Sequence, residues 1–223
     1  MCGRFTLTLN PAELQEQFGL SEPPPKELAP RYNIAPSQAV AVIANNADRK
    51  LELFKWGLIP SWAKDPKIGN KMINARAETL AEKPSFRTAL KRRRCLVVAD
   101  GFYEWKKTGS SKTPMYITLN DGRPFAFAGL WEAWQSPEDG LIKSCTIITT
   151  EPNALMADIH NRMPAILPPD AYDQWLTPGE LAAEAALPLL QPYDAAQMKA
   201  APVSTRVNSP AVDTAECILP VVA

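Results

Sequence analysis

The sequence is poor in the features that most directly assign a protein to a class. It contains no run of about 18 apolar residues, which excludes a transmembrane helix. The opening MCGRFTLTLN has no apolar segment of the kind that forms the centre of a signal peptide. The four cysteines, Cys2, Cys95, Cys145 and Cys217, form no CxxC pair, which argues against a zinc knuckle or a thioredoxin-like motif. We therefore expect a cytoplasmic protein with free thiols and with no metal or organic cofactor.

Net charge is also missing, because 24 Lys and Arg residues balance 24 Asp and Glu residues. Taken as a total, this weighs against a nucleic-acid partner. The charges are nevertheless segregated: residues 64–112 hold 13 basic and 5 acidic residues, whereas residues 170–223 hold 7 acidic and 2 basic ones. Such asymmetry is typical of a protein that contacts a polyanion. A solvated helix face is the other interpretation of the basic run KRRR.

The remaining composition is that of an ordinary folded protein, with 46% hydrophobic and 22% charged residues in a chain of 223. Glycine is scarce (10 residues) and proline abundant (22), so we expect short elements with stiff connections. Many short strand-like runs with few helices, and no regular βαβ alternation, predict an α+β fold built on a strongly bent antiparallel or mixed sheet. No linker divides the chain, which predicts one domain over residues 1–223.

The clearest local signal is a helix in NPAELQEQFG, with Asn10 as N-cap, Pro11 at the first helical position and Gly19 past the end. Further helices are expected at residues 84–93, near 153–159, at 169–177 and at 178–188. The strand-like runs are RFTLTL, AVAVIA, LELFKWGLI, RCLVVADGFYEW, MYITL, PFAFAGLW, CTIITT, PAILP and ECILP.

Cys2 draws attention because it follows the initiator Met1. Methionine aminopeptidase removes Met1 before small residues, and the new N-terminus would carry an α-amine and a thiol on adjacent carbons. An α-amine has a pKa of about 7.7–8.0, so part of it is neutral at physiological pH, unlike lysine. Such an amine forms a Schiff base with an aldehyde, and the neighbouring thiol can then close a five-membered thiazolidine ring.

Three further segments carry polar side chains that suit chemistry. In KMINARAET, a strand would place Asn74, Arg76 and Glu78 on one face, where the arginine suits a phosphate and the asparagine can hold an N-terminus; a half-exposed strand without function gives the same pattern. In DGFYEWK, Glu104 stands between two aromatic residues that would raise its pKa, although a surface glutamate would look the same. DIHNRMPAIL holds His160, the only histidine, through which any imidazole acid–base step must pass, together with Arg162.

These pieces, in this order, resemble the SRAP (SOS response-associated peptidase) family. The resemblance covers most of the chain and is carried by MCGRF, RYNIAPSQ, FKWGLIPSWA, INARAET, RCLVVADGFYEW, AGLWE, DIHNRMPAIL and VSTRVN. It implies an α+β fold with a barrel-like β core and peripheral short helices. It also implies a protein that traps ring-opened abasic sites in single-stranded DNA as a thiazolidine crosslink and so protects the lesion during replication.

Roles follow from the resemblance for nine residues. Cys2 would supply amine and thiol, Asn74 would orient it, Glu104 would shuttle protons, and His160 would assist sugar ring opening. Arg4, Arg76 and Arg162 would hold phosphates that flank the lesion. Pro36 and Trp62 would stack on neighbouring bases or wedge them apart.

Two alternatives remain open from the sequence. One is a thiol peptidase with Cys2 as nucleophile and His160 as base, for which removal of its own Met1 would be the minimal reaction. The other is a non-covalent reader of modified or single-stranded DNA. As partners we expect single-stranded DNA containing abasic sites and replication-fork proteins, and no membrane. The chain is expected to act as a monomer and to associate with the nucleoid when it is engaged on DNA.

Overall fold

The first helix of the structure forms where its capping residues predict it. Helix α1 (Pro11–Phe18) begins after Asn10, whose side chain accepts hydrogen bonds from the backbone N–H groups of Ala12 and Glu13. It ends at Gly19, whose φ of 57° is a left-handed conformation that glycine adopts without strain. Capping of this kind depends only on neighbouring residues, which is why the sequence alone located this helix.

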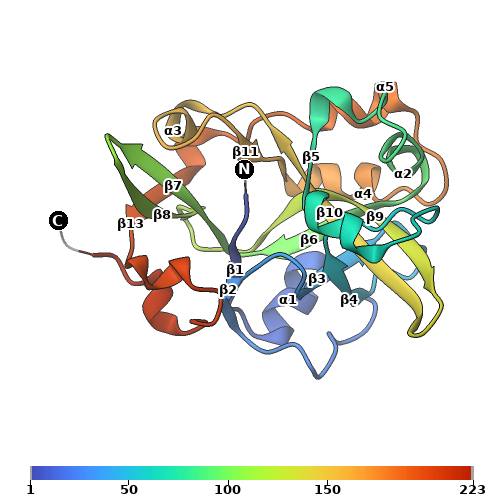
Figure 1. Ribbon diagram of the computed structural model, residues 1–223, viewed down its shortest axis with the longest axis horizontal. Helices are drawn as coiled ribbons and strands as arrows, with labels where there is room; N and C mark the ends of the chain where they lie inside the picture. The colour runs from blue at the N-terminus through green and yellow to red at the C-terminus, as the bar shows by residue number, and fades with distance from the viewer. Residues whose placement is uncertain (1, 222–223) are drawn as a thin grey trace.

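The computed structural model describes residues 2–221 and has an α+β architecture with two curved sheets and peripheral short helices (Figure 1). Met1, on whose removal the aminothiol hypothesis depends, lies outside the described residues. The larger sheet contains β3 (Ala39–Ala44), β4 (Leu51–Trp56), β5 (Asn74–Arg76), β6 (Arg94–Ala99), β9 (Phe125–Ser136), β10 (Gly140–Thr150), β11 (Met163–Pro164) and β12 (Ile166–Leu167). The smaller sheet contains β1 (Phe5–Leu7), β2 (Arg31–Ile34), β7 (Gly101–Thr108), β8 (Ser111–Leu119) and β13 (Met198–Pro202).

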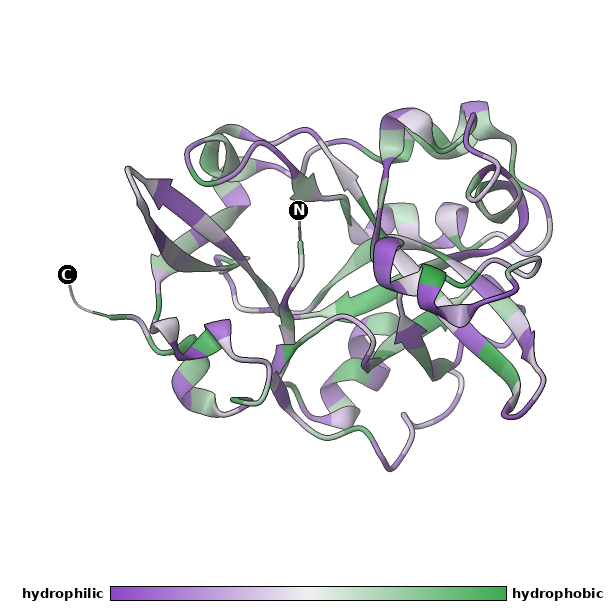
Figure 2. Ribbon diagram, viewed as in Figure 1, coloured by the Kyte–Doolittle hydropathy of each residue, from purple (hydrophilic) through white to green (hydrophobic). Residues whose placement is uncertain are grey.

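The larger sheet closes on itself, which confirms the expected barrel-like core. Its strands pair in the ring β10-β4-β3-β6-β9 and back to β10, with only the β10–β4 pair parallel. Short strands extend the ring: β5 pairs with β10 in parallel, β11 also pairs with β10, and β12 pairs with β9. Figure 2 shows the most hydrophobic residues along these central strands, whereas the β7–β8 hairpin is largely hydrophilic.

Strand β1 belongs to the smaller sheet and packs against the barrel. It pairs with β2 and β7 of the smaller sheet, in the order β13-β8-β7-β1-β2. Its Phe5 packs edge-on against Trp56 of β4 and Phe127 of β9, with ring centroids 5.1 and 5.7 Å apart. This aromatic contact fixes the start of the chain against the barrel.

The run RCLVVADGFYEW, expected as one strand, is two strands in different sheets. The chain passes from β6 to β7 at Asp100, whose carboxylate accepts hydrogen bonds from the side chains of Thr6 and Thr8. A Cβ on Gly101 would lie 2.3 Å from the hydroxyl of Tyr116, so only glycine fits here. The break turns β7 away from the barrel and sets the position of Glu104.

The helices are short and peripheral, near the expected positions. They are α2 (Arg87–Arg92), α3 (Ala154–Ala157), α4 (Tyr172–Trp175) and α5 (Ala183–Ala186), with 3-10 turns at η1 (Pro66–Lys71), η2 (Ala77–Thr79), η3 (Pro169–Ala171), η4 (Leu187–Leu189), η5 (Ala195–Gln197), η6 (Thr205–Asn208) and η7 (Ala215–Ile218). The strand predicted for ECILP is wrong, because most of it forms η7. Within residues 2–221, no helix has the length and apolarity needed to cross a bilayer.

Candidate active site

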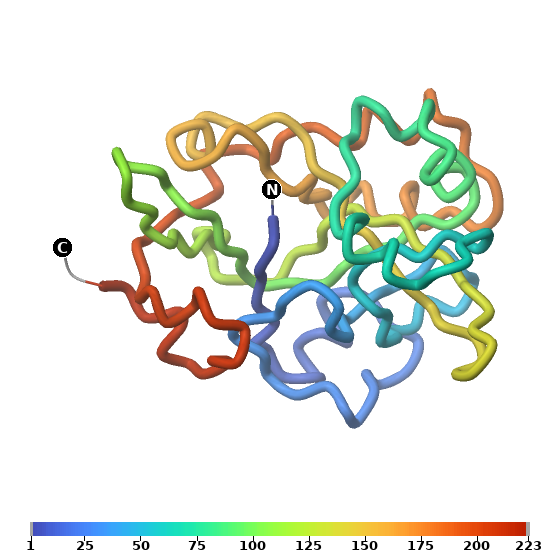
Figure 3. The backbone as a smooth tube through the Cα atoms, viewed as in Figure 1, coloured from blue at the N-terminus to red at the C-terminus, as the bar shows by residue number. Residues whose placement is uncertain are grey.

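The site is built around the first described residues, which lie between β5 and the β7–β8 hairpin (Figure 3). Cys2 is fully buried, three residues before the anchored Phe5. Strand pairing aligns Phe5 with Phe102 in antiparallel register, and the backbone N–H of Tyr103 donates to the carbonyl of Arg4 at 3.0 Å. Continuing that register past Phe102 brings Glu104 alongside the chain start.

Asn74 holds Cys2 from the other side. Its Nδ2 donates to the carbonyl of Cys2 at 2.8 Å. Parallel pairing with Ile147 in β10 fixes the backbone of Asn74. Among the described residues, Oδ1 of Asn74 is buried and has no hydrogen-bond partner. A buried acceptor of this kind suits a donor such as an α-amine.

Glu104 is the carboxyl group of the site, with only 2% of its surface exposed. Burial raises the pKa of this carboxyl above its usual range, and the charge of His160 partly opposes the rise. The expectation from the sequence, that aromatic neighbours would raise this pKa, has the right direction. A carboxyl with a raised pKa can donate a proton as well as accept one near neutral pH.

The thiol of Cys2 is kept protonated by its surroundings. Burial raises the pKa of this thiol well above its usual range, and the charge of Glu104 raises it further. Its Sγ lies 3.8 Å from the carbonyl oxygen of Arg4, as a weak donor.

His160 follows α3 and is fixed at its backbone and at its ring. Its backbone N–H donates to the carbonyl of Met156 at 2.8 Å, and its Nδ1 accepts from the backbone N–H of Arg162 at 3.1 Å. Glu104 interacts electrostatically with both His160 and Cys2. The four residues expected to be catalytic, Cys2, Asn74, Glu104 and His160, thus come together from four separate parts of the chain.

The arginines expected to hold phosphates are placed differently from one another. Arg76 is exposed at the end of β5. Arg162 donates to both carboxylate oxygens of Glu78, at 2.6 and 3.0 Å, and to the carbonyl of Thr149 at 2.6 Å. Glu78 itself lies in the turn η2 and not on the predicted strand, which ends at Arg76.

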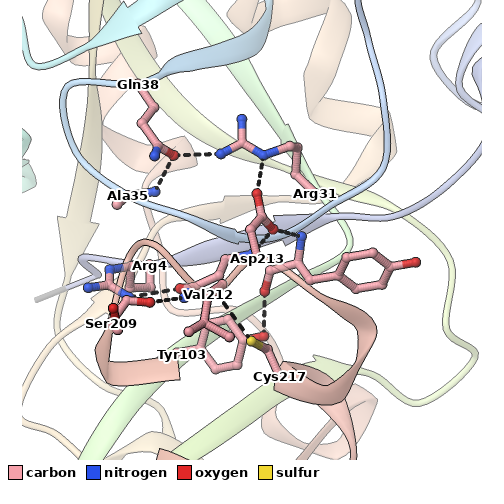
Figure 4. Close-up of polar contacts among 11 residues, drawn as sticks. Arg4, Arg31, Ala35, Gln38, Tyr103, Ser209, Val212, Asp213 and Cys217 are labelled. Atoms are coloured by element: carbon pink, nitrogen blue, oxygen red, sulfur yellow. Dashed lines mark hydrogen bonds and ion pairs between the residues drawn. The ribbon is translucent and has the colours of Figure 1, made fainter. Parts of the chain in front are cut away.

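Arg4 takes part in a hydrogen-bond network with the C-terminal loop, residues 203–218 (Figure 4). Its guanidinium donates to Oδ1 of Asn33 at 2.8 Å and to the carbonyl oxygens of Val207 and Asn208 at 2.5 and 3.1 Å. The nitrogen that reaches Asn208 is at the exposed side of this network. Arg4 therefore has a structural role whatever else it contacts.

Pro36 and Trp62 lie on loops whose adjacent residues are fixed by hydrogen bonds to other segments. Trp62 has 60% of its surface exposed, while the next residue, Ala63, accepts a hydrogen bond from the buried indole of Trp134 at 2.7 Å. Pro36 is half-buried in a turn whose next residue, Ser37, donates to Asn70 at 3.1 Å. The supported loop presents the indole of Trp62 to solvent, which is the arrangement that base stacking requires.

In the basic run KRRR, residues 91–94, the three arginines make contacts within the protein, whereas Lys91 is exposed. Arg94 is fully buried and donates to carbonyl oxygens of α2, of the last residue of α4 and of the segment after α4. Arg93 pairs with Glu132 at 2.9 Å, and Arg92 pairs with Glu180. The polyanion interpretation of this run, drawn from charge asymmetry, therefore fails for Arg94 and is weakened for the other two.

Two buried or half-buried residues that support the chain start were not predicted from the sequence, namely Asn33 and Asp213. Asn33 is fully buried, and its Nδ2 donates to the carbonyls of Val207, Ser209 and Val212. Asp213 accepts from the backbone N–H groups of Tyr32 and Asn33, at 2.6 and 2.8 Å. No local pattern marks this pair, because their partners are about 180 residues away. Within residues 2–221, no group of three or more His, Cys, Asp and Glu side chains has the arrangement of a metal site.

Comparison with known proteins places this geometry in context. A family model described as SOS response associated peptidase (SRAP) matches residues 1–210. The abasic site processing protein YoqW of Bacillus subtilis (strain 168) is 51% identical over 221 residues, covering 98% of this chain and 99% of the relative. The abasic site processing protein HMCES of Xenopus tropicalis is 34% identical over 266 residues, covering 100% and 79%. A crystal structure of a Bacteroides thetaiotaomicron protein superimposes with a TM-score of 0.90 at 28% identity, over 99% of this chain and 100% of the other.

Proposed function

The chain belongs to the SOS response associated peptidase (SRAP) family, and from this premise we propose that it processes abasic sites in DNA by trapping them covalently. The observation that carries the proposal is the burial of Cys2 between an amide that holds its carbonyl and a carboxyl of raised pKa. Relatives named abasic site processing proteins, aligned over nearly the whole chain, support the substrate.

The reaction begins once Met1 has been removed and Cys2 carries a free α-amine. An abasic deoxyribose is mostly a closed hemiacetal, so a base must take the proton of its hydroxyl while an acid protonates the ring oxygen. The amine nitrogen then attacks the exposed aldehyde, and loss of one water gives a Schiff base. The thiol adds across the C=N bond, its sulfur joining carbon and its proton reaching nitrogen, which closes the thiazolidine.

The neighbouring side chains fit these steps. Glu104, buried and with a raised pKa, exchanges protons with the sugar and with the nitrogen of Cys2. Asn74 holds the carbonyl of Cys2, and its buried Oδ1 is available to orient the new α-amine. His160 lies within electrostatic reach of Glu104 and assists ring opening.

The DNA substrate is single-stranded in this proposal. Because an abasic site has no base to read, recognition rests on phosphates and stacking. The exposed Arg76, which follows Asn74 on β5, supplies a phosphate contact next to the site. The exposed indole of Trp62, with Pro36, supplies a stacking surface for a neighbouring base.

A thiol peptidase is the less well supported alternative. A cysteine nucleophile attacks as its thiolate, whereas burial and Glu104 raise the pKa of the Cys2 thiol well above its usual range. The same protonation is compatible with thiazolidine closure, in which the thiol transfers its proton to nitrogen. Removal of Met1 by the chain itself is the minimal form of this peptidase alternative, whereas lyase-like release of the DNA belongs to the crosslinking proposal as a secondary activity.

The test incubates protein shown by mass spectrometry to lack Met1 with single-stranded DNA that carries one abasic site. We expect a heat-stable shifted band on a denaturing gel for the wild-type protein. Cys2→Ser keeps the amine but loses the thiol, so its Schiff base should give a stable band only after borohydride reduction. Cys95→Ala, which changes a buried cysteine on β6, is the matched control and should crosslink as the wild type does.

Two outcomes would contradict the proposal. If Cys2→Ser gave a heat-stable band without reductant in wild-type yield, the thiol would have no part in the linkage. If the wild-type protein gave no band and instead turned over peptides, the peptidase alternative would hold.

A further inference from the structure

The carboxylate of Glu78 grips the guanidinium of Arg162 at two points. Arg162 donates through both terminal nitrogens to the two carboxylate oxygens, and through one of them to the carbonyl of Thr149 on β10. Only 15% of the Arg162 side chain is exposed, compared with 51% for Glu78. A bidentate pair of this kind fixes the plane and direction of the guanidinium. Arg162 is therefore held at its tip by two separate elements, η2 and β10.

The main chain of Arg162 in turn fixes the ring of His160. The backbone N–H of Arg162 donates to Nδ1 of His160 at 3.1 Å. The segment His160–Arg162 lies between the end of α3 and the start of β11 at Met163, so it belongs to no regular element. A neutral imidazole whose Nδ1 accepts a hydrogen bond carries its proton on Nε2.

We infer that Glu78 is a positioning residue, which acts through Arg162 to hold His160 with its proton on Nε2. The inference rests on the proposed function for its purpose, since an Nε2–H imidazole is a hydrogen-bond donor toward the sugar during ring opening. It also gives Arg162 a task other than a phosphate contact, because its guanidinium already has a carboxylate and a carbonyl as partners.

The electrostatic interactions of Glu78 and His160 agree with the contact between Glu78 and Arg162. The hydrogen bond from Arg162 lowers the pKa of Glu78 below its usual range, and Arg76 lowers it further. Glu78 is thus ionised whenever the protein is folded near neutral pH. On the other side, the carboxyl group of Glu104 on β7 interacts electrostatically with His160.

The single histidine makes the inference directly measurable. Labelling the protein with 15N-histidine gives the two ring nitrogens of one imidazole, because the chain contains one histidine. Their chemical shifts tell which nitrogen carries the proton, and titrating them shows the pH range in which the ring is neutral. We expect the Nε2–H tautomer in the wild type, and a mixture of the two tautomers in Glu78→Gln, which cannot hold both guanidinium nitrogens.

Crosslinking kinetics supply the second readout. With saturating DNA, Glu78→Gln should form the crosslink about 10-fold more slowly, a modest part of what a positioned acid–base group contributes. The DNA concentration for half-maximal rate should change little. Arg162→Lys keeps the charge but loses the two-pronged contact, and it should reproduce the tautomer mixture if Glu78→Gln folds poorly. The matched control is Glu82→Gln, an exposed acid four residues further on.

The outcomes separate this inference from the proposed function. An unchanged tautomer in both Glu78→Gln and Arg162→Lys, or an Nδ1–H tautomer in the wild type, would overturn the inference. Tighter DNA binding by Glu78→Gln with an unchanged maximal rate would also overturn it, because Glu78 would then merely compete with a phosphate. Failure of the wild type to crosslink would instead contradict the proposed function, and the NMR result would still stand.

Discussion

At the scale of one residue, burial of the Glu104 carboxyl lowers the free energy of unfolding as the pH rises. A buried carboxyl whose pKa is raised on folding binds its proton more tightly in the folded state than in the unfolded state. Its contribution to the free energy of unfolding is fully present below the unfolded pKa of about 4.3. That contribution is lost as the pH rises through the higher folded pKa. This lower stability accompanies a functional gain, because a carboxyl of ordinary pKa would be a poorer acid near neutral pH.

Glu104→Gln should therefore stabilise the protein at pH 8 and leave its stability nearly unchanged at pH 4. The glutamine keeps the size of the side chain and has no charge to desolvate. We expect the Tm to rise by roughly 2–4 °C at pH 8, which is the shift that about 1 kcal/mol produces in a chain of this size. Thermal unfolding of both proteins from pH 4 to pH 8 measures the difference.

The same substitution should slow crosslink formation, since glutamine can neither donate nor accept a proton in the ring-opening step. Glu138→Gln, an exposed acid on the β9–β10 turn, is the control for loss of one charge. A Tm difference that is largest at pH 4 and vanishes at pH 8 would contradict the raised pKa of Glu104.

At the scale of elements, the C-terminal loop holds the first strands in place. Residues 203–218 pack with Tyr103 of β7 in a small apolar cluster that also contains Val203, Val207 and Cys217. Asn33 of β2 links this loop to Arg4 by accepting from the guanidinium and donating to three loop carbonyls. The position of Cys2 thus depends on a segment about 200 residues away.

Asn33→Ala should destabilise this connection. Removing the buried amide takes one hydrogen bond from the guanidinium of Arg4 and one from each of three loop carbonyls, which costs about 2–3 kcal/mol. In a chain of this size the Tm should fall by about 5–10 °C. Limited proteolysis should cut the loop at residues 203–218 before it cuts the barrel.

Asn46→Ala, at an exposed asparagine between β3 and β4, should change neither the Tm nor the cleavage pattern. If Asn33→Ala unfolded at the wild-type temperature and kept its C-terminal loop resistant to protease, the loop would be held by its apolar contacts alone.

The elements also show what sequence alone can predict. Helix α1 was predicted to the residue, because Asn10, Pro11 and Gly19 act on their own neighbours. The break at Asp100 was not predicted, because it depends on Thr6, Thr8 and the ring of Tyr116, which are distant in sequence. The predicted strand at ECILP failed for a related reason: an apolar run of that length fits a buried 3-10 turn as well as a strand.

The candidate site divides in the same way. Cys2, Asn74, Glu104 and His160 were predicted from the ordered motifs that carry the resemblance to the SRAP family, and the structure places them close to one another. The contacts that fix them were not found, since Glu78 pairs with Arg162 across 84 residues and Asn33 reaches Val212 across 179. Residue types indicate which chemistry a site can perform. The long-range contacts of these residues depend on how the barrel closes and on how β1 packs the smaller sheet against it, and no local pattern predicts them.

For the whole molecule, some of the charges that are segregated in the sequence are paired between distant segments of the fold. The acidic C-terminal third supplies partners to arginines elsewhere: Asp213 to Arg31, Asp173 to Arg49 and Glu180 to Arg92. Of these three arginines only Arg92 belongs to the basic segment 64–112, so in the ion pairs of residues 2–221 most of that segment's positive charge is not paired with the acidic third. Arg76 is exposed near Cys2 and has no ion pair among the described contacts that would compete with a phosphate.

Salt dependence of DNA binding should distinguish local from overall charge. In a Cys2→Ala background, which cannot form the stable thiazolidine, we expect single-stranded DNA to bind through two or three phosphate contacts. The logarithm of the binding constant should then fall with the logarithm of salt concentration with a slope of about −1.4 to −2.1, because each contact contributes about −0.7. Arg76→Ala should reduce that slope by about 0.7. Arg92→Ala, from the basic run paired with Glu180, should leave it unchanged. Equal losses in the two variants would mean that DNA follows the basic run at α2 and not the strand that carries Asn74.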